Sequence, residues 1–401
     1  MIAIEQAHAM LSELASKVRQ AKPLEIEHLP LDQIGGRVLA QDITARLDQP
    51  SDDLSAMDGV AFGHTTSLNL DLIGTIAAGA SRQTQPVQPG QAVRIMTGAP
   101  LPPGTDRVEM VEKVRFEADQ VKLNHSVPAG QHVRKKGSHV QAGSLFLSAG
   151  QKLGPSQIGA LASQGIETVP VIRKIRVCLS STGDELVPLG QPLKSGQIHD
   201  SNNPQLNDLL GRAGLDVQSQ PHRADVLEDL TQFLKDQTAD LIVLSGGVSM
   251  GNFDWVPQAA EAAGFQCVFH KVKMKPGKPL WVGKHEDQRI LLGLPGNPVS
   301  AYIGATLFLL PLVQALQTGH YHPQPFVPVT LTAGIQNHSD LPLYFPIRWT
   351  TDFEGVPTAF PVSTAGSGDI IRFAQLNGIG RLDAHTALSP PDTAPVFLFA
   401  P

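Results

Sequence analysis

The chain has little cysteine, few aromatic residues and no excess of basic residues. Its 401 residues include 2 cysteines, an aromatic content of 5% and a formal net charge of −6. Two cysteines are too few for the disulfide framework of a secreted protein, so we expect Cys178 and Cys267, both in apolar stretches, to be buried reduced thiols. The acidic balance excludes a general nucleic-acid surface, because a phosphate backbone requires a basic face.

Long hydrophobic runs and a leader sequence are also missing. No uninterrupted stretch of 18 apolar residues occurs, so the sequence predicts no membrane span. Residues 1–20 carry Glu5, His8 and Glu13 and have no apolar core, which argues against a signal peptide. Together with reduced thiols, these absences predict a cytoplasmic protein.

What the chain does contain is irregularly spaced glycine and proline, 37 and 32 residues respectively. Apolar residues recur at helical spacing over 4–18, which predicts an opening amphipathic helix. A short β stretch is expected within 36–49. Short strand-like runs punctuated by Gly and Pro fill 51–148 and predict an all-β module, after which 156–164 returns to helix.

The pattern changes near Arg173, where apolar strands begin to alternate with helices. The expected strands are 174–180, 240–245 and 289–294, and the expected helices are 203–213, 224–237 and 299–318. This alternation predicts a doubly wound, mostly parallel sheet with helices on both faces. Short strands return after a Pro-rich stretch near residue 320. The expected fold class is therefore multidomain α/β plus β, with β-rich domains flanking a central α/β domain.

Three Gly/Pro-rich loops crowd into the α/β region. They read Ser-Gly-Gly-Val-Ser-Met-Gly-Asn-Phe-Asp (245–254), Lys-Pro-Gly-Lys-Pro (275–279) and Gly-Leu-Pro-Gly-Asn-Pro (293–298). Two of them follow predicted strands directly, which is where open α/β sheets bind ligands. Loop N–H groups combined with Lys275 and Lys278 indicate a site for a polyanion. Two solvated surface lysines are the alternative interpretation of the pair.

Acidic residues near the same strand ends indicate a metal site. Glu185, Asp200, Asp225 and Asp254 each follow or neighbour a predicted strand end. Carboxylate oxygens suit Mg²⁺, which bridges phosphate oxygens. Taken singly, each of these residues is more often a helix cap or a solvated side chain, so the indication comes from the set.

Weaker signals lie outside the α/β region. Asp58 lies in an Asp-Gly pair, which is also a common hairpin signal, and Thr97 follows a predicted strand with its hydroxyl free to contact a ligand. His320 and His322 have a loose metal-like spacing. They fall in a linker without a third ligand, so we do not expect a metal there.

Seven motifs, taken together and in this order, resemble the molybdopterin molybdenumtransferase (MoeA) family, which includes the E domain of gephyrin. The resemblance covers nearly the whole chain. The motifs are Ser-Ala-Met-Asp-Gly (55–59), Arg-Ile-Met-Thr-Gly-Ala-Pro (94–100), Ser-Thr-Gly-Asp-Glu-Leu (181–186), Gly-Gln-Ile-x-Asp (196–200), Ser-Gly-Gly-Val-Ser-x-Gly (245–251), Lys-Pro-Gly-Lys-Pro (275–279) and Gly-Leu-Pro-Gly-Asn-Pro-Val-Ser (293–300).

The resemblance implies an enzyme that inserts molybdate into molybdopterin adenylylated on its phosphate, with release of AMP and assistance from Mg²⁺ or Zn²⁺. It also implies elongated homodimers, and protein partners such as molybdopterin adenylyltransferase and other cofactor-biosynthesis proteins. The implied domains are a linker and dimerisation domain (1–50 with 140–172), a β-rich domain (51–139), an α/β molybdopterin-binding domain similar to the adenylyltransferases (173–320) and a C-terminal β domain (321–401).

The resemblance also implies the site residues. Lys275, Lys278, Arg348 and Ser367 would bind molybdate. The catalytic residues would be Asp58 and Thr97 from the partner subunit, together with Glu185, Asp225 and Asp254, which would hold metal and nucleotide phosphates. The other substrate contacts would be Ser181, Thr182, Gly183, Asp200, Ser245, Gly246, Gly247, Ser249, Gly251, Pro295, Gly296, Asn297 and Pro298.

The chain departs from the family pattern at two places. Gly137-Ser138-His139 stands where the family has Gly-Glu-Asp, and Val60 replaces the usual Tyr after Asp-Gly. The first change removes an acidic residue tied to activity. A catalytically weakened paralogue that binds molybdopterin or nucleotide as a carrier or scaffold is therefore the alternative function. A nucleotidyl or phosphoryl transferase for another anion is a third interpretation.

Overall fold

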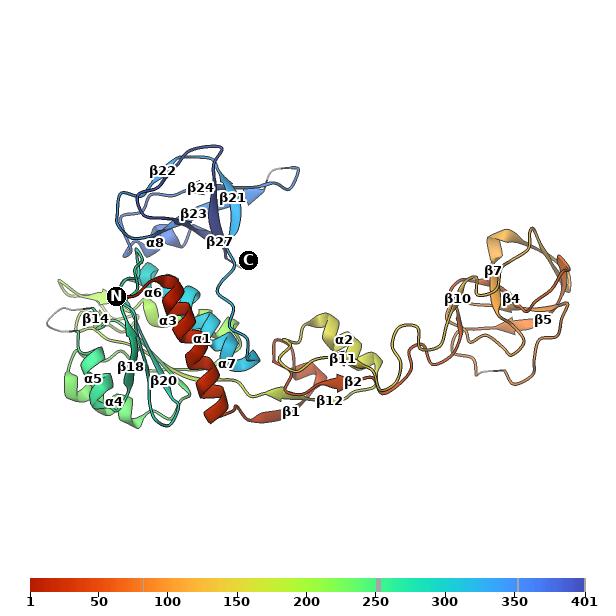
Figure 1. Cartoon of the computed structure of the whole chain (residues 1–401), viewed down its shortest axis with the longest axis horizontal. Coiled ribbons are helices and arrows are strands. Elements are labelled where there is room, and N and C mark those ends of the chain that lie inside the picture. The colour runs from red at the N-terminus through yellow and green to blue at the C-terminus, as the bar shows by residue number, and fades with distance from the viewer. Residues whose placement is uncertain (82, 250–253, 352, 400–401) are drawn as a thin grey trace. The chain divides into compact units, whose positions relative to one another are not determined.

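The computed structural model describes residues 1–81, 83–249, 254–351 and 353–399 (Figure 1). The chain divides into two compact units. Unit 1 comprises Met1–His28, Gly36–Ala40 and Pro170–Pro401, and unit 2 comprises Leu29–Gly35 and Gln41–Val169. This division is coarser than the four domains expected from the sequence, whose boundaries stay a prediction.

Unit 1 is built on a six-stranded sheet of order β16-β13-β17-β20-β19-β18. The first four of these strands are parallel, and β19 and β18 are antiparallel to their neighbours. The predicted mostly parallel sheet is thus confirmed. The strands are β13 (Arg176–Ser181), β16 (Asp216–Ser219), β17 (Leu241–Ser245), β18 (Gln266–His270), β19 (Trp281–Lys284) and β20 (Ile290–Leu294), with a separate short pair β14 (Leu186–Val187) and β15 (Ile198–His199).

Helices cover both faces of this sheet (Figure 1). Along β17, Leu241 and Val243 pack on one face while Ile242 and Leu244 pack on the other, which is why the strand is apolar throughout. The doubly wound arrangement is confirmed. On the first face lie α1 (Ile4–Ala21), α3 (Asn202–Arg212), α6 (Pro298–Gly304) and α7 (Leu310–Thr318), and on the second lie α4 (Leu227–Asp236) and α5 (Val256–Ala262).

The helix expected over 299–318 is interrupted by one π-helical turn, Ala305–Leu309, between α6 and α7. Within the described residues, the stretch Pro298–Thr318 is the one helix with the length and apolarity to cross a membrane. However, 83% of it is buried inside the protein. Its side chains belong to the apolar core on the first face of the sheet, which is typical of a buried helix in a globular protein.

The C-terminal part of unit 1 is a closed barrel of order β21-β24-β23-β25-β27. The backbone of this part bonds directly to the loop 275–279, which carries Lys275 and Lys278. The Lys275 N–H donates to Pro342 O (2.9 Å), and the Tyr344 N–H donates to Lys275 O (2.7 Å). The barrel therefore holds this loop in place. Its elements are β21 (Val327–Leu331), β22 (Ile335–Gln336), β23 (Leu343–Thr351), β24 (Pro357–Pro361), α8 (Ile370–Phe373), β25 (Gly378–Leu382), β26 (Ala387–Leu388) and β27 (Thr393–Leu398).

Unit 2 contains a six-stranded sheet of order β7-β4-β6-β5-β9-β8 with an apolar cluster on each face. The predicted β-rich character of this segment is confirmed. Its elements are β2 (Ile43–Thr44), β3 (Leu54–Ser55), β4 (Gly59–Phe62), β5 (Asn69–Ile76), β6 (Gln91–Ile95), β7 (Arg107–Met110), β8 (Val114–Glu117), β9 (Gln120–Leu123), β10 (Val133–Arg134), β11 (Leu145–Leu147) and α2 (Pro155–Ser163). Strands β1 (Ile26–Pro30) and β12 (Thr168–Ile172) pair with each other, and two short 3₁₀ helices are formed by Leu31–Gln33 and Val111–Lys113.

The expectation for one cysteine is wrong. Cys178 is buried on β13, and burial raises the pKa of its thiol to about 11. Cys267, by contrast, is exposed. It lies on β18 at the edge of the sheet, where the pairing with β19 shifts register between Cys267 and Phe269, so the side chain is not enclosed.

The helix expected from residue 224 begins later, at Leu227. The Asp225 N–H donates to the Asp184 carboxylate (3.1 Å) and the Val226 N–H donates to Ala224 O (2.8 Å). These bonds hold 224–226 in a tight turn. Asp225 consequently lies in a loop ahead of α4 rather than within the helix.

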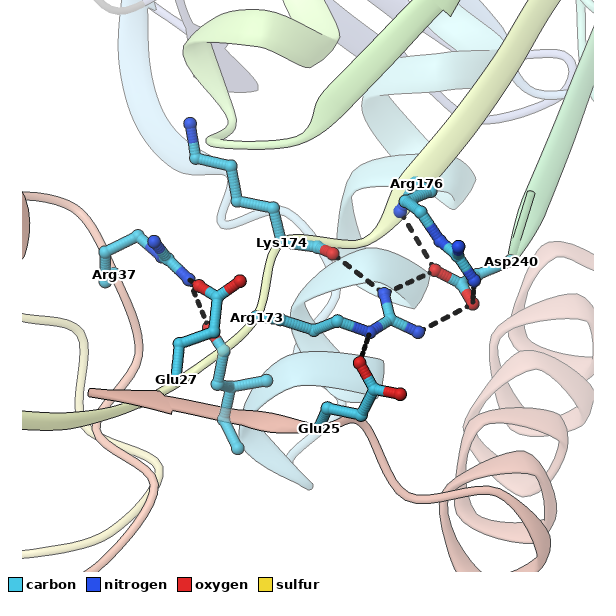
Figure 2. Close-up of polar contacts among 8 residues, drawn as sticks. Glu25, Glu27, Arg37, Arg173, Lys174, Arg176 and Asp240 are labelled. Atoms are coloured by element: carbon cyan, nitrogen blue, oxygen red, sulfur yellow. Dashed lines mark hydrogen bonds and ion pairs between the residues drawn. The ribbon is translucent and has the colours of Figure 1, made fainter. Parts of the chain in front are cut away.

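A polar network lies at the amino ends of the parallel strands, the edge opposite the Gly/Pro loops (Figure 2). Arg173 donates through both terminal nitrogens to Asp240, at 2.7 and 2.9 Å, and the Arg176 N–H donates to the same carboxylate at 2.9 Å. Glu25 lies 3.5 Å from the Arg173 guanidinium. The network joins the chain that enters the sheet to the start of β17.

Candidate active site

The loops that follow β13, β17 and β20 leave the sheet side by side because these strands are in register. Ser181 at the end of β13 pairs with Ser245 at the end of β17, and Ser245 pairs with Leu294 at the end of β20. The chain beyond each strand therefore emerges at the same carboxyl edge. This is where open α/β sheets bind ligands.

The loops enclose a cavity of about 400 Å³, the carboxylate cavity, which contains Glu185, Asp225 and Asp254. It gathers most of the expected substrate and metal residues in one place. Those on its wall are Thr182, Gly183, Glu185, Asp200, Asp225, Ser245, Gly246, Gly247, Ser249, Asp254, Pro295, Gly296 and Pro298. Gly251 lies outside the described residues.

Glycine is required where the loop after β17 passes the loop after β13. Gly246 has φ +103°, and a Cβ built on it would lie 2.4 Å from Thr182 O. Gly247 has φ +63°, and its Cβ would lie 2.9 Å from the Thr182 hydroxyl. Only residues without a side chain permit this close approach.

Two of the expected substrate residues hold the loops together. Asp200 Oδ1 accepts hydrogen bonds from the Ser181 hydroxyl and from the Asn202 and Asn203 N–H groups, each at 3.1 Å. The Ser245 hydroxyl donates to Pro295 O (3.1 Å). Ser181 does not line the cavity, but its hydrogen bond helps to hold the Asp200 carboxylate in place.

Asn202 is a site residue that sequence reasoning missed. It is buried at the start of α3, and its amide donates to the Ser245 hydroxyl (2.7 Å) and to Gly296 O (2.6 Å). It therefore ties the loop after β17 to the loop after β20. Its place two residues after Asp200, at a predicted helix start, is the only signal that the sequence offered.

The electrostatics of the carboxylate cavity favour a cation. Burial, followed by the charge of Asp184 and then that of Glu185, raises the pKa of Asp225. The Asp184 N–H, and after it the Thr182 hydroxyl, act in the opposite direction without cancelling the rise. Asp225 Oδ1 is shielded and finds no hydrogen-bond partner among the residues that the structure describes. A cation at this oxygen would relieve both the repulsion and the missing contact.

A larger cavity of about 1220 Å³, the lysine cavity, adjoins the first. It contains Lys275, Lys278, Asn297 and Ser367. In the part of the chain that the structure describes, no carboxylate or carbonyl pairs with either ammonium group. The two cavities share the wall residues Glu185, Ile198, His199, Ser201, Ser249, Pro279, Pro295, Gly296 and Pro298.

The barrel contributes Ser367 to the lysine cavity but not Arg348. The Asn297 amide donates to the Ser367 hydroxyl (3.0 Å), and the Val299 N–H donates to Ser367 O (3.1 Å). Arg348 lies on β23 and is exposed, outside the lysine cavity. Its neighbour Ile347 packs into the barrel core, so strand alternation turns Arg348 outward.

Asp58 and Thr97 lie together in unit 2. Asp58 Oδ1 accepts from the Thr97 N–H (2.6 Å) and from the Thr97 hydroxyl (2.8 Å). The expectation that this hydroxyl is free is therefore wrong, because Asp58 holds it. His139 and Arg134 line a separate cavity of about 360 Å³ in the same unit.

The chain matches known proteins along most of its length. Residues 2–165 match the MoeA N-terminal region (domains I and II), and 178–315 match the probable molybdopterin binding domain. A molybdopterin molybdenumtransferase of Synechococcus elongatus is 39% identical over 77% of this chain and 79% of its own length. The corresponding protein of Haemophilus influenzae is 38% identical over 79% and 78%.

A solved structure agrees with these matches. The molybdopterin biosynthesis MoeA protein of Pyrococcus horikosii covers 100% of both chains with a TM-score of 0.79 and 27% identity. Its likeness supports the multidomain α/β plus β fold. With relatives above 30% identity over more than two thirds of the sequence, this chain belongs to the molybdopterin molybdenumtransferase (MoeA) family, a family of transferases in molybdenum cofactor biosynthesis.

Proposed function

We propose that this chain inserts molybdate into adenylylated molybdopterin, with release of AMP and formation of the molybdenum cofactor. The observation that carries the proposal is one pair of adjoining cavities. Lys275 and Lys278, whose ammonium groups have no partner in the described part of the chain, lie in one, and three carboxylates lie in the other. A tetrahedral dianion suits the lysines, and a nucleotide phosphate with a divalent cation suits the carboxylates and the glycine loop.

In this mechanism the protein supplies mainly position and charge. Lys275 and Lys278 hold molybdate beside the molybdopterin sulfurs, while the loop at Gly246 and Gly247 approaches the phosphates. An oxygen of water or molybdate forms a bond to phosphorus, the phosphoanhydride P–O bond breaks, and AMP leaves with the bond's electron pair. The buried hydrogen bonds of Asp200 and Asn202 keep the loops fixed during the reaction.

The carboxylate cavity offers part of the ligand set for Mg²⁺ or Zn²⁺. Asp225 has a raised pKa and one oxygen without a partner among the described residues, and Glu185 and Asp254 line the same cavity. Among the described residues, no three His, Cys, Asp or Glu side chains converge closely enough to form a complete metal site. Substrate phosphates would therefore supply the remaining ligands, as is common for Mg²⁺. The bound cation would neutralise charge on the phosphoanhydride.

The family resemblance extends the proposal to assembly and location. We infer a cytoplasmic homodimer in which Asp58 and Thr97 of one subunit complete the site of the other, with adenylyltransferase and other cofactor-biosynthesis proteins as partners. In this arrangement the molybdate ligands are Lys275, Lys278, Ser367 and Arg348. Arg348 would act only after a movement of the barrel or the partner subunit, since it lies outside the lysine cavity.

A weakened carrier is the second candidate, favoured by Ser138 and His139 in place of two acids. The structure adds that His139 lines a cavity together with Arg134 and Asp48. Such a protein would bind AMP and molybdate without turnover. The assay that follows separates the two functions.

The test supplies adenylylated molybdopterin, molybdate and Mg²⁺ and measures AMP release. The Lys275→Ala variant should lose activity by about 100-fold or more, because one preorganised charge contact to a reacting anion is removed. Lys273→Ala is the matched control, since Lys273 is exposed on the same loop but does not line the cavity. AMP release by the unaltered chain no faster than by Lys275→Ala would refute the enzyme and leave the carrier.

A further inference from the structure

His199 lies in the wall between the carboxylate cavity and the lysine cavity. It lines both, together with Glu185. The short strand β15 places it there: Ile198 and His199 pair in parallel with Leu186 and Val187, and the Ile198 N–H donates to Glu185 O (2.9 Å). In the sequence this position is the unspecified residue of the Gly-Gln-Ile-x-Asp motif, so the motif assigns it no role.

Its imidazole has no hydrogen-bond partner in the described chain. Nδ1 is shielded from solvent and unpaired, and Nε2, which is not among the shielded unpaired atoms, remains accessible. Two other half-buried histidines of unit 1 do have partners: His8 Nδ1 bonds to the Tyr321 hydroxyl (2.8 Å), and His270 Nε2 bonds to Val248 O (3.0 Å). His199 is thus positioned by its backbone and by packing, with one ring nitrogen open.

The shielding of Nδ1 selects a tautomer. A buried N–H without an acceptor is rarer in proteins than an under-used acceptor, because an unpaired donor loses its hydration outright. The proton of the neutral imidazole therefore belongs on Nε2, the accessible nitrogen. His199 accordingly presents a hydrogen-bond donor at the boundary of the two cavities.

We propose that the Nε2–H of His199 donates a hydrogen bond to a phosphate oxygen of the nucleotide substrate. The neighbouring acidic side chains Glu185, Asp225 and Asp254 carry no proton to donate when ionised, and they repel phosphate. A ring N–H in the same wall supplies the donor that these carboxylates lack. This inference rests on the proposed function, and it names a substrate contact that the family motifs leave open.

The test is AMP binding, measured by titration calorimetry on the full-length chain with Mg²⁺ present. His199→Ala should weaken AMP affinity about tenfold, the loss expected for one hydrogen bond to a charged group. His199→Gln, whose amide reaches the position of Nε2, should stay within about threefold of the unaltered chain, whereas His199→Asn, which mimics Nδ1, should bind as weakly as Ala. Molybdate affinity measured without AMP should not change.

His222→Ala is the matched control. His222 is a partly buried histidine that lines a neighbouring cavity beyond Asp200, so its removal should leave AMP affinity unchanged. Equal AMP affinity in the unaltered chain and in His199→Ala overturns the inference, and so does rescue by Asn but not Gln. If the unaltered chain binds neither AMP nor molybdate, the proposed function itself fails. Thermal unfolding of His199→Gln and His199→Ala confirms that both variants are folded.

Discussion

At the scale of single residues, Asp58 and Thr97 form a local hydrogen-bonded pair within unit 2. The hydrogen bond from the Thr97 N–H is the largest influence that lowers the pKa of Asp58, and the bond from the Thr97 hydroxyl is the second. The Arg94 charge adds to both. Asp58 is therefore ionised and oriented throughout the physiological pH range, as a residue that contacts a cation or a donor must be.

Removing only the hydroxyl should shift this equilibrium in a known direction. Thr97→Val keeps the shape of the side chain and the backbone bond but loses the hydroxyl bond, so the pKa of Asp58 should rise toward its ordinary value. Thr97→Ser retains the hydroxyl and should leave the pKa low. Carboxyl chemical shifts followed by NMR over an acid titration measure this. An unchanged pKa in Thr97→Val would show that the hydroxyl bond does not persist in solution.

At the scale of elements, the loop after β17 is the most constrained part of the candidate site. Gly246 combines a positive φ with close backbone approach to Thr182, and Gly296 lies next to it in the wall of the same cavity. A Cβ on Gly296 would find only Gly246 Cα, at 3.6 Å, an ordinary contact. The two glycines therefore give a matched pair in one cavity.

Gly246→Ala should lower the free energy of unfolding by about 2–3 kcal/mol, because both the left-handed backbone and the backbone clash oppose it. It should also weaken AMP binding, since the loop must shift. Gly296→Ala should change stability by less than about 1 kcal/mol. Urea unfolding of the two variants measures the difference. Comparable losses would mean that the loop relaxes to admit a side chain.

At the scale of the whole molecule, the Arg173–Asp240 pair joins segments distant in sequence (Figure 2). Burial opposes the ionisation of Asp240 and is the largest single influence. The hydrogen bonds from Arg173 and the Arg176 N–H, with the charges of both arginines, outweigh it and lower the pKa below its ordinary value. The ionised pair thus contributes to the stability of unit 1.

Asp240→Asn should destabilise unit 1 by about 3 kcal/mol at neutral pH, since it removes the buried carboxylate that Arg173 contacts and leaves only the exposed and more distant Glu25 as a charged partner. Because the pKa of Asp240 is lower in the folded state, this stabilisation is complete above the unfolded-state pKa of about 3.9 and disappears as the pH falls through the folded-state pKa. Chemical unfolding at neutral and acidic pH should therefore show the two proteins converging in acid.

The control is Asp208→Asn, which breaks the exposed pair of Asp208 with Arg212. Surface pairs of this kind contribute little, so its unfolding free energy should change by less than about 1 kcal/mol. A loss for Asp240→Asn no larger than for Asp208→Asn would show that the network is solvated.

The sequence by itself determined the period of the elements and the local chemistry. Continuous apolar runs at β13, β17 and β20 predicted buried parallel strands, and the Gly/Pro loops after two of them predicted an anion site. These features depend on neighbours along the chain, which is why they could be predicted. The motif order also indicated the family, which the relatives confirm.

Only the tertiary structure decided which residues meet. Strand register brings Ser181, Ser245 and Leu294 to one edge, and no local pattern encodes that alignment. The same long-range packing exposes Cys267 at a sheet edge, engages the Thr97 hydroxyl, turns Arg348 outward and places His199 between two cavities. Burial and pairing depend on contacts between segments far apart in the chain. The sequence therefore indicated which side chains could act, and only the fold determined which of them are buried, hydrogen-bonded or brought together.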